Sequence, residues 1–267
     1  MFIIKTIWSL MKKMPRVISL VLLFINIFLL AFLLLGCTNI GDIYSSTYLI
    51  EYTFNKSSPI YPLIRDSYAS KNLSGYETLS VRASYLSLCI YIEGYDMQCT
   101  SRSDLDTFAR TTAVEIYQVN SNASAVSLDI VELASTFSND IVHPYILIVS
   151  VIFTIILFLM LFYIVIPELP GKTMLTRVVL LLSCIVTLLW SIGSIWAHVA
   201  VDAGKNLTQE ASMGIIKAEV GSKAESMTWV PFSFNLVVVV TLFYLYFRDL
   251  KQNQKENSSQ LNVDYKV

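Results

Sequence analysis

Charged residues are scarce in this sequence. Asp, Glu, Lys and Arg together make up 15 % of its 267 residues, whereas a typical soluble domain has about 25 %. A soluble protein of this length would need much more polar surface, so the composition argues against that class. The formal net charge of −1 provides no positive field for nucleic acid, and we set nucleic acid aside as a partner.

The sequence also lacks the motifs of a catalytic or metal site. It has no glycine-rich phosphate loop, no pair of catalytic carboxylates and no nucleophile–base motif, so we expect neither an enzyme nor a cofactor. Its two histidines are His143 and His198. His198 and Asp202 would face each other on a helix, and we interpret them as a cap at the membrane interface, with cation binding as the alternative. We assign no catalytic residue and no metal ligand.

Four long apolar runs explain the shortage of charge. They lie at 17–36, 145–166, 178–199 and 230–247, and none has a charged residue in its interior. Each has about twenty residues, enough for a helix to cross a hydrocarbon core of roughly 30 Å. The sequence therefore predicts a mainly α membrane protein with a four-helix transmembrane bundle, whose first partner is the lipid bilayer.

Basic residues gather beside particular ends of these runs. The N-terminal tail has four of them and no acid, the turn after the second run has Lys172 and Arg177, and the C-terminal tail has four more. Because basic flanks stay in the cytoplasm, we expect both termini inside. The expected segments are a tail (1–16), a span (17–36), a large outer loop (37–144), a span (145–166), a turn (167–177), a span (178–199), a second outer loop (200–229), a span (230–247) and a tail (248–267).

Sequons for N-glycosylation agree with this orientation. Four of the five lie in the expected outer loops, and the fifth, at Asn257, lies in the inner tail. The candidate glycosylation sites are therefore Asn55, Asn72, Asn122 and Asn206. The tail after Phe247 is rich in Gln, Asn and Ser, and we expect it to be disordered.

The first run resembles a signal peptide, because Leu34-Leu35-Gly36-Cys37 looks like a bacterial lipoprotein cleavage box. Its apolar stretch of about nineteen residues is longer than the 7–15 of a signal peptide, so we expect a retained membrane anchor. Cys37 is then either free or lipidated. Cys184, inside the third span, is interpreted as a packed thiol.

The large outer loop begins with strand patterns. Apolar and polar residues alternate in 48–54 and in 79–86, and a third strand is expected at 88–92, with a turn at Glu93-Gly94. From 104 to 133 the apolar residues recur at helical spacing, which predicts one or two amphipathic helices. The second outer loop contains Ile215, Ile216 and Val220 among charged residues, and is expected to extend the third span as a helix.

Cys89 and Cys99 are the cysteine pair well inside the outer loop. On the oxidising side of a membrane, two thiols ten positions apart should form a disulfide. The closed loop would stabilise the fold by about 3 kcal/mol on the loop-entropy model. A metal site would require closer spacing and histidine partners, and a catalytic thiol would require a nearby base.

Small polar residues form a row in the third span, and Asn235 lies in the fourth. Ser183, Thr187 and Ser191 repeat every four positions, and Gly193 and Ala197 add a pair of small residues. Such a row lets helices approach closely, so we expect a helix-packing seam, with a polar ion pathway as the alternative. The spans carry no ionisable residue of the kind that pumps and channels use, which favours a regulator over a pore.

The layout resembles the claudin-like tetraspan superfamily, and within it the fungal pheromone-induced family. The likeness depends on 34–37, on the strand at 48–52 and on the motif that ends at Cys89. That motif runs Gly, two apolar residues, Gly, any residue, Cys, and later a second Cys. The matching residues are Ser84, Tyr85, Leu86, Ser87, Leu88, Cys89 and Cys99. Both motif glycines are serine here, which implies a different local backbone if positive φ is required.

The resemblance implies a plasma-membrane protein that regulates calcium influx and membrane fusion at cell–cell contacts during mating. Its implied partners are other membrane proteins, such as a calcium channel or the fusion machinery, or a second copy of itself. The alternatives are a cation-conducting channel subunit and a cortical-domain scaffold or pH-signalling tetraspan protein.

Overall fold

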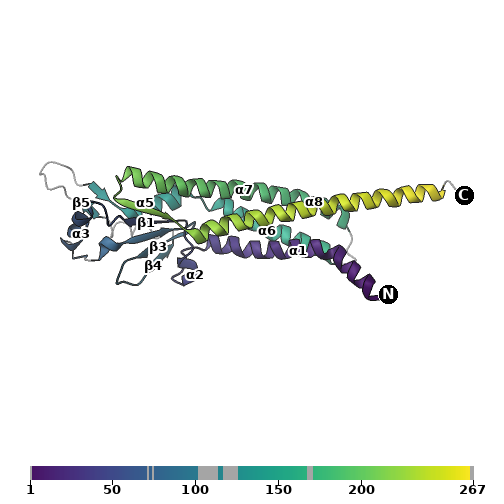
Figure 1. Cartoon of the computed structure of the whole chain (residues 1–267), viewed down its shortest axis with the longest axis horizontal. Coiled ribbons are helices and arrows are strands. Elements are labelled where there is room, and N and C mark those ends of the chain that lie inside the picture. The colour runs from purple at the N-terminus through teal and green to yellow at the C-terminus, as the bar shows by residue number, and fades with distance from the viewer. Residues whose placement is uncertain are drawn as a thin grey trace. The chain divides into compact units, whose positions relative to one another are not determined.

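The computed structural model describes residues 2–70, 72, 73, 75–101, 114–116, 126–166 and 171–264. Figure 1 shows the chain and labels its elements where there is room. The chain forms two compact units. We call Met1–Leu29, Val149–Ile192 and Val230–Val267 the bundle unit, and Leu30–Ile148 and Gly193–Trp229 the sheet unit.

Four long apolar helices are present among the described residues. They are α1 (Phe2–Leu34), α6 (Tyr145–Val165), α7 (Lys172–Ala211) and α8 (Ser222–Asp264). Each contains a stretch long and apolar enough to cross a membrane: Met14–Leu34, Tyr145–Val165, Met174–Ala211 and Ser222–Gln252. The four expected spans are therefore confirmed as helices, and the protein is a multi-pass membrane protein. A helix suits this setting because it satisfies its backbone hydrogen bonds internally where lipid offers no partner.

A cluster of buried aliphatic residues in the bundle unit draws on all four helices. Its buried residues are Leu23, Leu157, Leu161, Ile164, Val179, Val186, Val238 and Leu242. On the other side of α7, Leu181, Leu188 and Ile192 are more than 60 % exposed to the surroundings. An outward row of large apolar side chains is expected of a helix whose solvent is lipid.

The C-terminal region differs from expectation. We expected disorder after Phe247, but α8 continues without a break to Asp264. The helix is already nucleated within the apolar segment, so each added residue gains a backbone hydrogen bond without a new nucleation cost. Lys, Gln and Glu in this stretch are also good helix formers.

The sheet unit contains a five-stranded antiparallel sheet in the order β4-β3-β2-β1-β7. Its strands are β1 (Ile50–Phe54), β2 (Ser80–Ala83), β3 (Ser87–Tyr91), β4 (Gln98–Ser101) and β7 (Ile216–Val220). The three strands expected from the sequence are confirmed, as is the turn at Gly94, where φ is +90°. Shorter helical segments are α2 (Asp42–Ser45), α3 (Tyr61–Ser70), η1 (Tyr76–Thr78), α5 (Ile130–Thr136) and the π-helical η3 (Phe137–Ile141).

β7 corrects the expectation of a helix through the second loop. α7 does extend to Ala211, but Ile216–Val220 then pairs with β1 along its whole length. Its burial alternates, with Ile216 and Ala218 inward and Lys217 and Glu219 outward. This period-2 pattern was visible in the sequence, but its partner strand lies more than 150 residues away.

The segment 104–133 also differs from the helices expected there. Val114–Ile116 (β5) and Val126–Leu128 (β6) form a two-stranded antiparallel sheet, and only α5 is helical among the described residues of this segment. Val and Ile are β-branched, which favours pairing in a strand. The expected helical positions Leu105, Phe108, Ala109, Thr112 and Val119 lie outside the described residues.

The apolar face of the sheet forms the core of the sheet unit. Tyr52 on β1 is buried and meets the ring of Phe137 edge to face, with 6.4 Å between centroids. α5 packs against β1 and β2, and it begins at Asp129, whose carboxylate accepts hydrogen bonds from the amides of Val131 and Glu132. Capping of this kind fixes where the helix starts.

Candidate functional site

A disulfide joins the edge strand β4 to its neighbour β3. Cys89 on β3 lies directly opposite Cys99 on β4, and their sulfur atoms are bonded. The pairing expected from the sequence is therefore present. It fixes this edge strand to the next strand, where otherwise only a short ladder of backbone hydrogen bonds would hold it.

The motif that precedes Cys89 contacts the end of the first span. Ser84–Ser87 connects β2 to β3, and the amide of Ser84 donates to the carbonyl of Ser87 over 3.1 Å. The hydroxyl of Ser87 donates to the carbonyl oxygen of Gly36 over 2.9 Å. The two sequence signatures, 51 residues apart at these positions, are thus joined in the fold.

Gly36 makes this contact possible because it has no side chain. A Cβ there would lie 2.3 Å from the carbonyl oxygen of Thr47 and 2.5 Å from Oγ of Ser84. Neither Ser84 nor Ser87 has a positive φ; the non-glycine residues that do, among those the structure describes, are Cys37 at 58°, Asn72 at 59° and Met213 at 51°. The two serines therefore need no glycine-like backbone here, and the close approach depends on Gly36 instead.

Cys37 is fully buried beside the disulfide. Its thiol lies 3.9 Å from the carbonyl of Thr47, and Sγ of Cys89 lies 3.5 Å from the carbonyl of Cys37. Burial raises the pKa of the Cys37 thiol to about 12. A protonated, buried thiol is unreactive, and complete burial leaves no room for an acyl chain in the folded protein. Cys184 is also a free cysteine, partly buried.

The outer face of the sheet carries an ionic cluster that the sequence did not reveal. Nε of Arg82 lies 3.2 Å from Oε1 of Glu51, and the guanidinium also donates to the carbonyl of Ser45 and lies 4.9 Å from the ring centre of Tyr48. Ser80 donates to the same carboxylate. Both charged side chains are under 25 % exposed. The cluster ties β1 and β2 to the segment that follows the first span.

Beside this cluster lies a polar groove of about 490 Å³. Its charged lining residues are Glu51, Lys56, Glu77, Arg82, Glu93 and Lys217. The register places Glu51 opposite Arg82 on one side, and Thr53 opposite Lys217 on the other. Acidic and basic side chains are mixed along the groove. It therefore presents charged groups of both signs and no strong electrostatic potential of a single sign.

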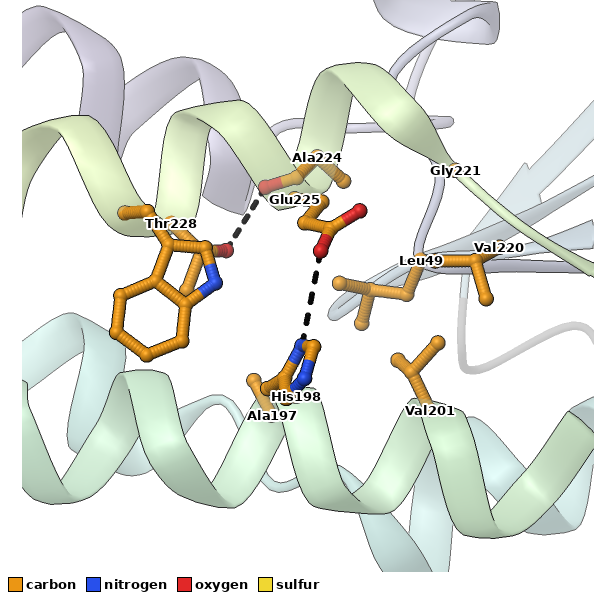
Figure 2. Close-up of a pocket in the computed structure, with 10 residues that line it drawn as sticks. Leu49, Ala197, His198, Val201, Val220, Gly221, Ala224, Glu225 and Thr228 are labelled. Atoms are coloured by element: carbon orange, nitrogen blue, oxygen red, sulfur yellow. Dashed lines mark hydrogen bonds and ion pairs between the residues drawn. The ribbon is translucent and has the colours of Figure 1, made fainter.

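His198 contacts a different residue from the one expected. Its Nδ1 lies 3.7 Å from Oε1 of Glu225 on α8, and its ring meets Trp229 edge to face. Figure 2 shows this pair among the residues that line a small pocket, which also include the aliphatic Leu49 and Val201. The enclosed volume is about 20 Å³, room for about one water molecule. Asp202, expected to face His198, is not part of this pair, because the helix opposite α7 offers a carboxylate instead.

The polar row on α7 is largely buried. Ser183 is 1 % and Thr187 6 % exposed, and Ala197 and Gly193 are buried as well. The hydroxyls of Ser183, Thr187 and Ser191 donate to carbonyls three or four residues earlier on the same helix. The small side chains of the row are thus buried, and their hydroxyls form hydrogen bonds within α7 itself. The role of the row as a helix-packing seam stays a prediction.

Asn26 lies within the first span, and no role was predicted for it from the sequence. Nδ2 of Asn26 donates to Oδ1 of Asn235 on α8 over 2.8 Å, and the two side chains are 0 % and 2 % exposed. A buried amide in an apolar span could have been noticed, because it requires a partner. Of the four candidate glycosylation sites, Asn55, Asn72 and Asn206 belong to the sheet unit, and Asn122 lies outside the described residues.

Comparison with known proteins agrees with these features. The family model for the Ca²⁺ regulator and membrane fusion protein Fig1 matches residues 67–248. The chain is also similar to the Factor-induced gene 1 protein of Saccharomyces cerevisiae, with 35 % identity over 277 aligned residues that cover 96 % of this chain and 92 % of that protein. The matched residues include the disulfide, four strands of the sheet and most of three spans. The chain therefore belongs to the Fig1 family of Ca²⁺ regulators and membrane fusion proteins.

Proposed function

We propose that this chain regulates calcium influx and supports membrane fusion at cell–cell contacts of the plasma membrane during fungal mating. The observation that carries the proposal is the similarity that runs through 96 % of the chain to a protein named as factor-induced. The family description supplies calcium regulation and membrane fusion. Four apolar helices supply the membrane setting that both activities require.

The proposed orientation places both termini in the cytoplasm and the sheet unit outside the cell. It is supported by the basic residues near 1–16 and 167–177, since such residues stay on the cytoplasmic side. The disulfide supports it as well, because disulfides persist in oxidising compartments. A claudin-like architecture is part of the proposal, supported by four spans and a bridged antiparallel sheet.

Within this function, the chain acts as a regulator rather than as a pore. The buried side chains of the bundle unit that the structure describes are apolar or uncharged, as Asn26 and Asn235 are. Its described ion pair between distant residues, Arg16 with Asp249, lies at the ends of the apolar stretches. An ion pathway would place ionisable side chains inside the spans. The sheet unit, with its polar groove, provides the surface for a channel, the fusion machinery or a second copy.

The test is a strain that lacks this gene, supplied either with the wild-type chain or with an empty vector. During exposure to a mating partner, the wild-type chain is expected to restore both calcium uptake and the fraction of pairs that fuse. Equal uptake and fusion in the two strains would overturn the proposal. Purified protein in liposomes separates regulator from pore: we expect no calcium flux from the chain alone, and flux lost on Asn235→Leu would establish conduction instead.

A further inference from the structure

We propose that Ile40 and Ile43 insert into the headgroup region of the membrane beside the end of the first span, and so anchor the start of the sheet unit to the lipid surface. Both residues belong to the short connection between α1 and β1. The inference goes beyond the proposed function, and it does not depend on which side of the membrane faces the cytoplasm.

The two isoleucines are more exposed than residues of their size and polarity usually are. Ile40 is 58 % exposed and Ile43 is 61 % exposed, and they lie only three positions apart. Single apolar side chains on a surface are ordinary, whereas large ones gathered in one short segment mark a place of interaction. What covers them depends on where the segment lies relative to the span.

A backbone hydrogen bond keeps this segment close to the end of the span. The amide of Cys37 donates to the carbonyl of Tyr44 over 2.9 Å, which closes residues 38–43 into a loop. Cys37 lies three residues after Leu34, where the apolar stretch of the first span ends. With three residues on each side, the loop reaches at most about 10 Å from this hydrogen bond. The headgroup layer on each side of the hydrocarbon core is roughly 5–8 Å thick, so the loop starts within it.

Tyr44 turns the loop back towards the span. The centre of its ring lies 6.2 Å from the centre of the Phe32 ring, and Phe32 belongs to the apolar stretch of α1. The carbonyl of Tyr44 also accepts a hydrogen bond from the amide of Thr47 over 3.1 Å. α2 is therefore held beside the last turns of α1, at the depth where the span meets the headgroups.

Lipid is the neighbour that the first span itself leads to at this depth. Phe28 and Leu35 are each at least 40 % exposed, and their spacing of seven residues is that of one face of a helix. Ile40 and Ile43 follow this outward-facing row directly along the chain. Interfacial segments of membrane proteins bury their apolar side chains about 5–10 Å into the boundary between headgroups and acyl chains. The same depth suits the two isoleucines.

The polar groups of the segment favour a shallow position. Asp42 lies between the isoleucines and is exposed. Nζ of Lys223 donates to Oγ of Ser46 over 2.8 Å, at the other end of α2. Charged side chains stay among the headgroups because burial in hydrocarbon is costly for them. The segment therefore lies in the interface and does not enter the hydrocarbon core.

The experiment measures the surroundings of position 43 in the full chain, reconstituted in phosphatidylcholine nanodiscs. Ile43→Cys is combined with Cys184→Ser and labelled with nitrobenzoxadiazole, a fluorophore sensitive to its environment. Cys37 is buried and the remaining two cysteines are paired, so the new thiol is the one that reacts. Phosphatidylcholine with a nitroxide at the start of its acyl chain quenches from the lipid, and iodide quenches from the water. The control is Leu63→Cys in the same background, because Leu63 on α3 is apolar and 49 % exposed.

The two quenchers should give opposite results at the two positions. We expect the lipid nitroxide to quench the label at 43 at least about threefold more than the label at 63, and iodide to show the reverse, since the former lies among lipid headgroups. Equal quenching of the two labels overturns the inference. So does a label at 43 that is shielded from both quenchers and self-quenches as the protein-to-lipid ratio rises, because a second copy of the chain would then cover the site.

An unlabelled variant tests the anchoring itself. The amides of Ser45 and Thr47 are hydrogen-bonded within the segment, to the carbonyls of Gly41 and Tyr44, so their hydrogen exchange reports how firmly the segment is held. Ile40→Ser/Ile43→Ser should speed this exchange in nanodiscs by about threefold or more, whereas Leu63→Ser should not change it. Both variants replace exposed side chains and should retain the disulfide, which gel mobility with and without reductant verifies. Equal exchange in the wild type and the double variant would show that the isoleucines anchor nothing.

Discussion

Asn26 and Asn235 meet inside the bundle unit through one hydrogen bond, from Nδ2 of Asn26 to Oδ1 of Asn235 over 2.8 Å. Oδ1 of Asn26 and Nδ2 of Asn235 are buried without a partner among the described residues. Each side chain is therefore tolerated in its apolar helix because the other is there. This pair links the first span to the fourth and sets the register between them.

Replacing one member of this pair should destabilise the protein more than replacing both. Asn26→Leu leaves a buried amide with no partner, at a cost of about 1–3 kcal/mol, whereas two leucines of similar size restore an apolar contact. The measurement is a double-mutant cycle of thermal unfolding in detergent. If Asn26→Leu/Asn235→Leu loses as much stability as the sum of the single variants, the two residues do not act as a pair.

Gly36→Ala should disrupt the contact between the first span and the β2–β3 connection. The added Cβ would lie 2.3 Å from a backbone oxygen of Thr47, so the chain must shift at a cost of about 1–3 kcal/mol. Gly41→Ala is the matched control, because its nearest neighbour is the Tyr44 ring at 3.7 Å. Surface expression and unfolding temperature are measured for both. A Gly36→Ala protein as stable as the control would contradict the close approach.

Loss of the disulfide should impair folding and activity together. Cys89→Ser opens the bridge, removing about 3 kcal/mol of stabilisation on the loop-entropy model, so we expect reduced surface delivery, calcium uptake and fusion. Cys99→Ser should behave alike, and Cys184→Ser, which affects a free cysteine, should not. Normal trafficking and full activity of Cys89→Ser would show that the bridge is dispensable.

The buried thiol of Cys37 should make stability depend on alkaline pH. Its pKa is 9.0 in the unfolded reference and about 12 in the fold, mainly because of burial. The contribution of the group is fully present below pH 9, and it is lost as the pH rises from 9 towards 12, because only the unfolded chain ionises there. The unfolding temperature of the wild type should fall more between pH 8 and pH 10.5 than that of Cys37→Ala. Parallel falls in the two proteins would refute this role.

Arg82 should resist even conservative replacement. Lysine retains the charge near Glu51, but it cannot also reach the carbonyl of Ser45 and lie over the Tyr48 ring as the guanidinium does. We expect Arg82→Lys and Arg82→Ala each to lose about 1–3 kcal/mol in unfolding free energy. Arg65→Ala is the control, because Arg65 and Asp66 are 60 % and 70 % exposed, and it should cost less than about 0.5 kcal/mol. If Arg82→Lys has the same free energy of unfolding as the wild type, the cluster depends only on the charge of Arg82 beside Glu51.

The sequence by itself determined the four spans, the first three strands and the cysteine pairing. A membrane span can be recognised from a local stretch of sequence, because a helix that crosses lipid needs about twenty consecutive apolar residues. The helix against which it packs does not have to be known. β1 alternates over five residues, and two cysteines ten positions apart leave little choice of pairing. These features depend on residues that are close together in the chain.

The tertiary structure alone decided the contacts between distant segments. β7 joins β1, Gly36 approaches Ser84, Asn26 finds Asn235, and His198 turns to Glu225 rather than to Asp202. A five-residue alternating run next to a long helix is locally ambiguous, and its conformation is settled by the strand that pairs with it. The periodicity of apolar residues indicates which side of a helix or strand is buried, but it does not indicate which other element packs against that side.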